Sequence, residues 1–382
     1  MWKAFSFKNK WILLLSAFLA GASSSPLRNS FDLQVPVVPS PLKVNDSMQL
    51  VYELHLTNFA KYPLTLKRLQ ILDSTRKTEI AAFQESQLAS RIGTFSQPEN
   101  SDRLTIPAGF HAVIYVEINV PESEIPSVID HRIEFADSNS QTTDSVTGGM
   151  VEVHKESLPA LGPPLRGGPW VAIYDPSWER GHRRVYYTTN GHARLPGRYA
   201  IDWMKLDADG HYAKGDSNQV SNWYGYGADV LAVADGVIAA TRDDVSESSS
   251  VSANPKHSLS DAAGNYVVIE IGRGKYATYE HLKPRSIRVK TGESVRRGEV
   301  IANLGFTGDS TGPHLHFHVA DGIVPLDSEG MPYLFQNFEW IGIYDSLDKF
   351  GSEPWKAIGK NVPAHRKDEY PESKAVIKFE VE

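Results

Sequence analysis

The stretch Gly312-Pro-His-Leu-His-Phe-His-Val319 alternates three histidines with apolar residues. In a β-strand, side chains two positions apart lie on the same face. The three histidines are therefore predicted to share one face, while Leu315 and Phe317 point into the opposite layer. Imidazoles separated by the rise of two strand residues, about 7 Å, can both reach one bound ion or its water. The stretch predicts a strand with a metal-binding or catalytic face, and the alternative is a polar face that happens to use histidine.

The same period of two predicts further strands around this stretch. They cover residues 229–234, 236–241, 266–271 and 276–282. Residues 243–264 are rich in Ser, Asp and Ala, which predicts an exposed, mobile loop. Strict alternation within 276–282 puts His281 on the face of Tyr279, at the end of a strand.

Residues 31–157 also alternate apolar and polar residues, in short bursts such as 48–56, 64–72 and 112–120. Turn-like stretches separate these bursts, and no long helical pattern intervenes. The pattern predicts an immunoglobulin-like β-sandwich, and the fold class of the whole chain is predicted to be all-β. Four histidines of this region share no spacing and are predicted to be surface or strand residues: His55, His111, His131 and His154.

Proline and glycine concentrate in residues 158–169, which predicts a linker. A second domain is expected at 170–345, followed by a C-terminal extension at 346–382. Eleven aromatic residues lie between Trp170 and Tyr226, and most are expected in the core, with two or three lining a cleft.

Residues 1–22 resemble a secretory signal peptide. Lys3, Lys8 and Lys10 precede an apolar run at 11–19 and then small residues at 20–22. The run is short for a membrane span, so no stable membrane insertion is expected after cleavage. The pattern predicts a secreted or periplasmic protein of the bacterial cell envelope.

The composition of the 382 residues excludes several classes of protein. The length suggests two domains, and 41% hydrophobic with 22% charged residues is ordinary globular composition. The net charge of -7 and the lack of a basic run argue against nucleic acid as a partner. With no cysteine, a secreted chain is expected to draw its stability from core burial instead of disulfides, and a bound metal can add to it.

A metal site needs ligands from elsewhere in the chain, and eight of the thirteen histidines lie between His182 and His318. Asp202 is the best carboxylate because it lies alone in a short apolar strand, where burial is costly without a cation or donors. The alternative for Asp202 is a structural salt bridge, with Arg198 as one partner. The acidic run 207–211 lacks the other positions of a calcium-binding loop and is predicted to be a surface turn.

Taken together, these residues resemble the lysostaphin/LytM-type zinc metallopeptidases, secreted endopeptidases that cut peptide cross-links of bacterial cell walls. Five stretches in the same order carry the resemblance: 227–236, 264–269, 276–282, 289–298 and 305–317. The resemblance implies a duplicated-hybrid-motif fold and a catalytic Zn²⁺.

It also implies roles for individual residues. His316, the second histidine of the His-x-His pair, would bind zinc. His314, together with His281 of the Tyr-x-His-Leu motif, would orient the attacking water and stabilise the tetrahedral intermediate. The remaining family ligands are a His and an Asp close together upstream, and Asp202 fits the Asp.

The first histidine ligand departs from the family pattern, because Arg198 stands four residues before Asp202. His182 and His192 are the two candidates. The stretch 181–184, Gly-His-Arg-Arg, is similar to the ligand segment of an envelope subgroup in which an insertion splits the His and the Asp. His182 is therefore preferred, since His192 lies in a turn flanked by Gly and Pro.

These features predict a secreted zinc metalloendopeptidase that hydrolyses peptide bonds, with peptidoglycan cross-links preferred over a protein as the substrate. The second hypothesis is a catalytically inactive LytM-type protein that activates a cell-wall hydrolase or acts as an envelope scaffold. Loss of ligands would separate the two hypotheses. The bond that is cut, the role of the N-terminal domain and the oligomeric state stay open.

Overall fold

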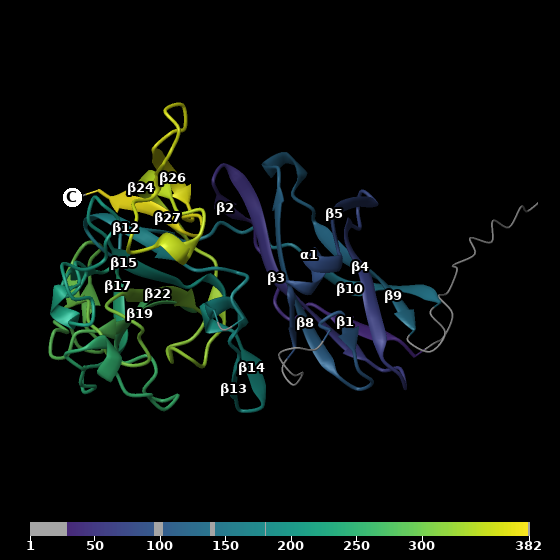
Figure 1. Ribbon diagram of the computed structural model, residues 1–382, viewed down its shortest axis with the longest axis horizontal. Coiled ribbons are helices and arrows are strands. Elements are labelled where there is room, and N and C mark those ends of the chain that lie inside the picture. Colours follow the sequence, from purple (N-terminus) through teal and green to yellow (C-terminus); the bar gives the residue numbers. More distant parts are fainter. Residues whose placement is uncertain (1–28, 95–101, 138–141, 180, 381–382) are drawn as a thin grey trace, which may run out of the picture.

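The computed structural model describes residues 29–94, 102–137, 142–179 and 181–380. The predicted signal peptide, residues 1–22, lies outside the described residues. Regular structure in the described part is almost entirely β-strand, which confirms the all-β fold class. Figure 1 shows two β-rich bodies side by side, one built from the first half of the chain and one from the second. Among the described residues, no helix has the length and apolarity needed to span a membrane.

The first body is a sandwich of two antiparallel sheets. One sheet has the order β1 (Phe31–Gln34), β3 (Ser47–Asn58), β8 (His111–Val120), β6 (Ile92–Thr94), with β2 (Leu42–Val44) beside β3. The other has the order β10 (Thr143–Glu152), β9 (Val128–Asp137), β4 (Leu64–Asp73), β5 (Thr78–Gln84), with β7 (Thr105–Ile106) beside β4. The helix α1 (Glu85–Ala89) and the 3₁₀ turn η1 (Glu122–Glu124) lie between strands.

The order of these strands corresponds to the A-B-E-D and G-F-C-C′ sheets of immunoglobulin-like sandwiches. The strands predicted at 48–56, 64–72 and 112–120 lie within β3, β4 and β8, so these predictions are confirmed. Side chains from both sheets meet in one apolar core, because alternate residues such as Leu50, Tyr52 and Leu54 point inward.

The second body is organised around one large sheet of thirteen strands in the described part of the chain. Its main path runs β11 (Ala160–Leu161), β24 (Leu334–Ile343), β27 (Ala375–Phe379), β12 (Gly167–Ile173), β15 (Ile201–Lys205), β22 (Leu315–Ala320), β19 (Lys275–Leu282), β18 (Asn265–Gly272), β17 (Gly236–Arg242), β20 (Ser294–Val295). Three short strands attach beside this path: β23 (Gly330–Met331), β25 (Lys356–Ala357) and β26 (His365–Glu369).

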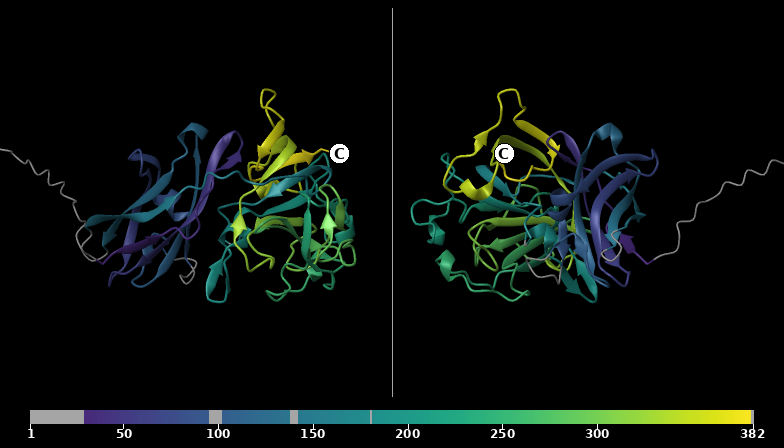
Figure 2. Two further views of the ribbon diagram at one scale, coloured as in Figure 1. Left: turned by 180° about the vertical axis from the view of Figure 1, so that it is seen from behind. Right: turned by 45° about the vertical axis from the view of Figure 1, so that its right-hand side comes forward.

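Smaller elements complete the second body. Two separate ribbons pair β13 (Tyr187–Thr189) with β14 (His192–Arg194) and β16 (Asp229–Leu231) with β21 (Val300–Asn303). The 3₁₀ turns are η2 (His182–Arg184), η3 (Pro196–Tyr199), η4 (Val220–Asn222), η5 (Val251–Ala253) and η6 (Leu347–Lys349). The β13–β14 hairpin projects from the side of this body that faces the sandwich (Figures 1 and 2).

Two segments differ from the sequence-based expectation. The expected linker, 158–169, contributes β11 and the start of β12 to the large sheet, and Leu161 and Leu165 are buried in its core. The expected C-terminal extension, 346–382, supplies β27, which lies between β24 and β12. In both segments, apolar side chains are buried against the sheet. The free energy gained by this burial outweighs the weak strand preference of the proline and glycine residues.

The centre of the large sheet positions the functional residues. β15, β22 and β19 are neighbours, and one face of each packs into the core through Ile201, Phe317 and Tyr279. Leu315 and Phe317 are fully buried there, as the alternation predicted. The opposite face of the same three strands is therefore free to carry polar side chains.

Candidate metal centre and catalytic cleft

Three neighbouring strands place polar side chains in one row. Asp202 on β15 lies opposite His316 on β22, and His316 lies opposite Glu280 on β19. His318 follows two residues along β22, on the same face. These residues line a cleft of about 370 Å³, together with His314, which precedes β22. The three histidines predicted to share one face therefore line the same cleft.

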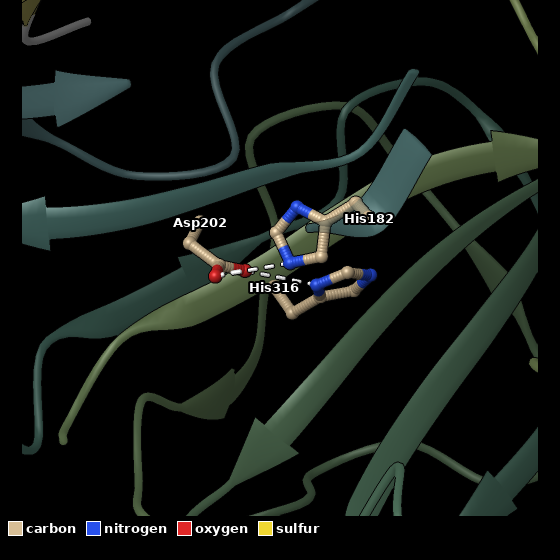
Figure 3. A group of neighbouring side chains, drawn as sticks. All are labelled: His182, Asp202 and His316. Atoms are coloured by element: carbon tan, nitrogen blue, oxygen red, sulfur yellow. Dashed lines mark hydrogen bonds and ion pairs between the residues drawn. The ribbon is translucent and has the colours of Figure 1, made fainter. Parts of the chain in front are cut away.

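His182 joins this row from a different segment, the short turn η2. Its Nε2 lies 3.1 Å from Asp202 Oδ2, and His316 Nδ1 lies 2.8 Å from Asp202 Oδ1 (Figure 3). The two imidazole rings meet edge to face, with their centroids 4.7 Å apart. The structure thus brings together the three residues that the sequence proposed as metal ligands.

The three side chains fit a catalytic zinc site by donor type and by spacing. Two imidazoles and one carboxylate are a ligand set that zinc accepts, and three protein ligands leave the fourth position for water. The ligand atoms lie within 4.8 Å of one another. A tetrahedral zinc ion with bonds of about 2.0–2.1 Å needs its ligands about 3.3 Å apart. Each histidine nitrogen lies about that far from an Asp202 oxygen, at 3.1 Å for His182 and 2.8 Å for His316.

The other candidate for the first histidine lies elsewhere. His192 is exposed on β14 and pairs with Thr189 across the hairpin. It is absent from the described residues that line the cleft. Of the two candidates from the sequence, the structure therefore places His182, and not His192, beside Asp202.

The electrostatic environment of Asp202 favours a negative carboxylate. Burial alone raises the pKa of Asp202, but the charges and hydrogen bonds of His182 and His314 outweigh it and hold the pKa well below the usual range. Arg198, the salt-bridge partner considered from the sequence, contacts Glu53 and Glu329 instead. The Asp202 carboxylate therefore stays negative, and its charge is available to the neighbouring histidines and to a cation bound between them.

His281 reaches the cleft through a break in the regular alternation of β19. Its φ is 60°, in the left-handed region that non-glycine residues rarely adopt, and the register with β18 shifts at this point. Both Glu280 and His281 line the cleft as a result, whereas Tyr279 is buried in the core. The expectation that His281 shares a face with Tyr279 was wrong, because the bulge turns His281 around. Backbone strain of this kind concentrates at functional sites.

Backbone carbonyls fix the orientation of His281 and His314. His281 Nδ1 donates to the Thr307 carbonyl at 2.8 Å, and His314 Nδ1 donates to the Gly312 carbonyl at 2.7 Å. In the neutral ring, a proton on Nδ1 leaves Nε2 as an acceptor. Burial lowers the pKa of His281 well below its usual value, so its ring is neutral. The two rings lie edge to face, with centroids 4.8 Å apart, beside the proposed ligands.

Glu280 and His318 form a buried pair that the sequence did not single out. Glu280 is 4% exposed and His318 is 1% exposed, and His318 Nδ1 lies 3.7 Å from Glu280 Oε1. Burial, followed by the charge of Asp202, raises the pKa of Glu280 to about 8. The pair lies within metal-binding reach of His316, but a second ion there would have only two ligands of its own. An acid directly before His281 in an apolar strand was the available signal in the sequence.

Residues 207–211 lie outside the cleft, whereas two aromatic residues of the 170–226 region line it. Asp207 accepts the backbone N–H groups of Asp209 and His211, which makes 207–211 a capped surface turn, as predicted. Trp178 and Tyr187 are the aromatic residues of the 170–226 region that line the cleft within the described part, in agreement with the expected two or three.

The family comparison supports the same part of the molecule. Residues 223–328 match Peptidase family M23. The similarity to this family is shown for residues 223–328. The match includes His281, His314 and His316, whereas His182 and Asp202 lie before it. The resemblance to lysostaphin/LytM-type peptidases is thereby confirmed for this segment.

Curated relatives match a short part of this chain. Peptidoglycan DD-endopeptidase ShyB of Vibrio cholerae is 48% identical over 66 residues, which are 17% of this chain and 15% of ShyB. An uncharacterized metalloprotease of Buchnera aphidicola is 38% identical over 93 residues, which are 24% of this chain and 20% of the relative. The chain therefore matches at most about a fifth of the length of these two relatives.

Solved structures were also found. The catalytic domain of lysostaphin from Staphylococcus simulans is 19% identical, with a TM-score of 0.24, and the match covers 44% of this chain and 88% of that one. A zinc-containing peptidase from Vibrio cholerae is 18% identical, with a TM-score of 0.26, and the match covers 74% and 80% of the two chains.

Gly197 gives a first test of the position of His182. An alanine Cβ at this position would lie 2.7 Å from the His182 carbonyl oxygen and 2.9 Å from its Cβ. We expect Gly197→Ala to displace η2 and weaken zinc binding about 10–100-fold, the range seen for residues that support metal ligands. Competition with a chromogenic chelator measures this affinity. Gly272→Ala, which adds a Cβ in open space, is the control, and equal affinities in the two variants would contradict the prediction.

Proposed function

We propose that this protein is a zinc metalloendopeptidase that hydrolyses peptide bonds in bacterial peptidoglycan. One observation carries the proposal. His182, Asp202 and His316 converge in a cleft, and His281 and His314 stand beside them with their Nδ1 protons held by backbone carbonyls. Three ligands next to two oriented imidazoles are the parts that metal-assisted hydrolysis requires.

The protein's own residues supply the proton chemistry. His281 keeps its proton on Nδ1, so Nε2 is available to accept a proton from the attacking water. His314 also holds a proton on Nδ1, but its Nε2 lies 3.3 Å from Asp202 Oδ1, and Asp202 helps to raise its pKa. A proton on Nε2 can orient the water and stabilise the oxyanion that develops on the peptide carbonyl. When bound, the zinc ion would polarise that carbonyl and lower the pKa of the water.

The lining of the cleft supports an extended peptide as the substrate. Trp178 and Leu259 are 40% and 70% exposed, and both line the cleft with Tyr187. Exposed apolar and aromatic side chains at a cleft provide contact area for a ligand. The DD-endopeptidase names of the relatives support peptidoglycan as the source of that peptide.

The competing function is a catalytically inactive member of the family that activates a hydrolase or acts as a scaffold. Such a protein has no use for a full set of ligands and oriented histidines. All five proposed residues are present and adjacent in this chain, which favours catalysis.

Metal analysis of the purified protein tests the proposal. The wild type and His192→Ala should each hold about one zinc ion per chain, because a catalytic site takes one ion. His182→Ala should hold almost none, since it removes one of the three ligands. Wild type and variants are then incubated with purified cell-wall sacculi, and mass spectrometry of the soluble products identifies the bond that is cut. A wild type without zinc under zinc-replete conditions would overturn the proposal.

We also propose that the protein acts in the cell envelope, after removal of residues 1–22. The basic, apolar and small-residue regions of that segment support this location. Fractionation of the bacterial cells, with mass spectrometry of the mature N-terminus, measures it. A full-length chain recovered from the cytoplasm would contradict the proposal.

A further inference from the structure

The segment 183–199 connects two of the proposed metal ligands, His182 and Asp202, and it lies against the sandwich. The segment contains the last two residues of η2, the β13–β14 hairpin and η3. Arg183, Arg184 and Arg198 are buried, with exposures of 5–8%. Because a buried guanidinium is costly without partners, their contacts decide how this segment is held.

Arg198 is fixed by a carboxylate of the sandwich. Its Nε lies 2.9 Å from Glu53 Oε2, and its Nη2 lies 3.0 Å from Glu329. Glu53 is only 2% exposed and comes from β3. The next residue, Tyr199, donates its hydroxyl to the Val51 carbonyl of the same strand. The end of the segment is therefore anchored to β3.

The start of the segment is anchored to β8 and its surroundings. Arg183 Nη1 lies 2.6 Å from Glu117 Oε2, and its Nη2 donates to the Val116 carbonyl. Arg184 donates to the Ser90 carbonyl at 2.8 Å. Its guanidinium carbon also lies 4.8 Å from the centre of the Tyr115 ring. Both arginines follow directly after His182.

Strand alternation explains why these acids face the second body. On β3, Leu50, Tyr52 and Leu54 enter the sandwich core, so the odd-numbered residues point outward. Glu53 and Glu117 lie on this outer face, where Val51 packs into the core of the second body. An acidic outer face therefore meets the basic segment between the ligands.

His182 depends on these contacts more than the other two ligands do. Asp202 and His316 are held by paired strands, whereas His182 lies in a turn of three residues. Its backbone packs against Gly197 of η3, so η2 and η3 support each other. A shift of either arginine anchor would be passed directly to the His182 side chain.

We propose that the sandwich completes the metal site, because Glu53 and Glu117 hold the segment that positions His182. The two glutamates are positioning residues for metal binding, and they act through Arg183 and Arg198. This inference rests on the proposed zinc site. It assigns to the N-terminal domain a role in assembling the centre.

Zinc affinity of full-length variants tests the inference. Glu53→Gln and Glu117→Gln keep the size of the side chain and remove its charge. Each should weaken zinc binding about 10–100-fold in a chelator competition, the range for residues that orient metal ligands. Peptidase activity of both variants should return in excess zinc, and circular dichroism of the zinc-free variants should match that of the zinc-free wild type, which excludes a general loss of folding.

Glu369→Gln is the matched control. Glu369 is also a buried glutamate at the interface between the two bodies, 3% exposed, and it pairs with Lys43 of the sandwich at 3.1 Å and with Arg366 at 3.8 Å. It lies on β26 and does not contact the segment 183–199 through any of these pairs. Its zinc affinity should stay within about threefold of the wild type.

The outcomes separate this inference from the proposed function. Equal affinity in Glu53→Gln, Glu117→Gln and the wild type would overturn the inference and leave the zinc site intact. Equal weakening in Glu369→Gln would overturn it too, since any loosening of the interface would then suffice. If Glu53→Gln does not fold, the result for Glu117→Gln decides whether the inference holds. The Glu117 side chain is 28% exposed, so replacing it disturbs the fold less. A wild type that binds no zinc overturns both proposals.

Discussion

Replacing His316 with alanine should leave a folded protein that neither retains zinc nor hydrolyses peptide bonds. His316 Nδ1 is one of the three proposed donors, and it lies 2.8 Å from the carboxylate of Asp202. Without it, His182 and Asp202 supply two ligands, fewer than the three of catalytic zinc sites. We expect the activity to fall more than about 100-fold, beyond the effect of removing a residue that only supports a ligand.

Metal content and thermal unfolding measure this effect. A ligand that binds only the folded state stabilises it by about 4 kcal/mol at a thousand times its Kd. Excess zinc should therefore raise the melting temperature of the wild type and leave that of His316→Ala unchanged. His154→Ala, which removes an exposed histidine of the sandwich, is the control and should behave as the wild type. Zinc retained at the wild-type level in His316→Ala would show that the ion binds elsewhere.

Replacing His281 should separate catalysis from metal binding. His281 lines the cleft, but it does not belong to the three-residue ligand group. We expect His281→Ala to keep its zinc and to lose about 10²–10⁴-fold in kcat/KM, the usual contribution of a general acid or base. Peptide hydrolysis and metal content are measured on the same preparation.

A second variant controls for the backbone at this position. His281 has a φ of 60°, which glycine adopts without strain. His281→Gly should therefore fold at least as well as His281→Ala and lose activity to the same degree. Loss of zinc in both variants would instead make His281 a ligand. Wild-type activity in both would remove it from the mechanism.

Much of the fold could be predicted from local patterns. Alternation in 48–56, 64–72 and 112–120 predicted three strands of the sandwich, and the His-x-His stretch predicted β22 with Leu315 and Phe317 in the core. These predictions succeeded because the period of a strand depends only on neighbours along the chain.

Other features depend on partners that are distant in the sequence. Residues 158–169 and 346–382 looked like a linker and an extension, because proline, glycine and polar residues interrupt their apolar pattern. In the structure they add strands beside β24 and β12, where pairing with a sheet already in place outweighs weak local preference.

The sequence by itself determined the all-β class, the strand that carries His316 and His318, and the similarity to metallopeptidases over the region that matches family M23. Only the tertiary structure decided that His182, and not His192, meets Asp202, and that a bulge turns His281 into the cleft. It also decided that Glu53 of the sandwich holds the segment behind His182. The physical reason is the same in each case. Alternation along a strand is a local property. The positions of a turn, a bulge and a buried ion pair depend instead on distant segments of the same chain that pack against them.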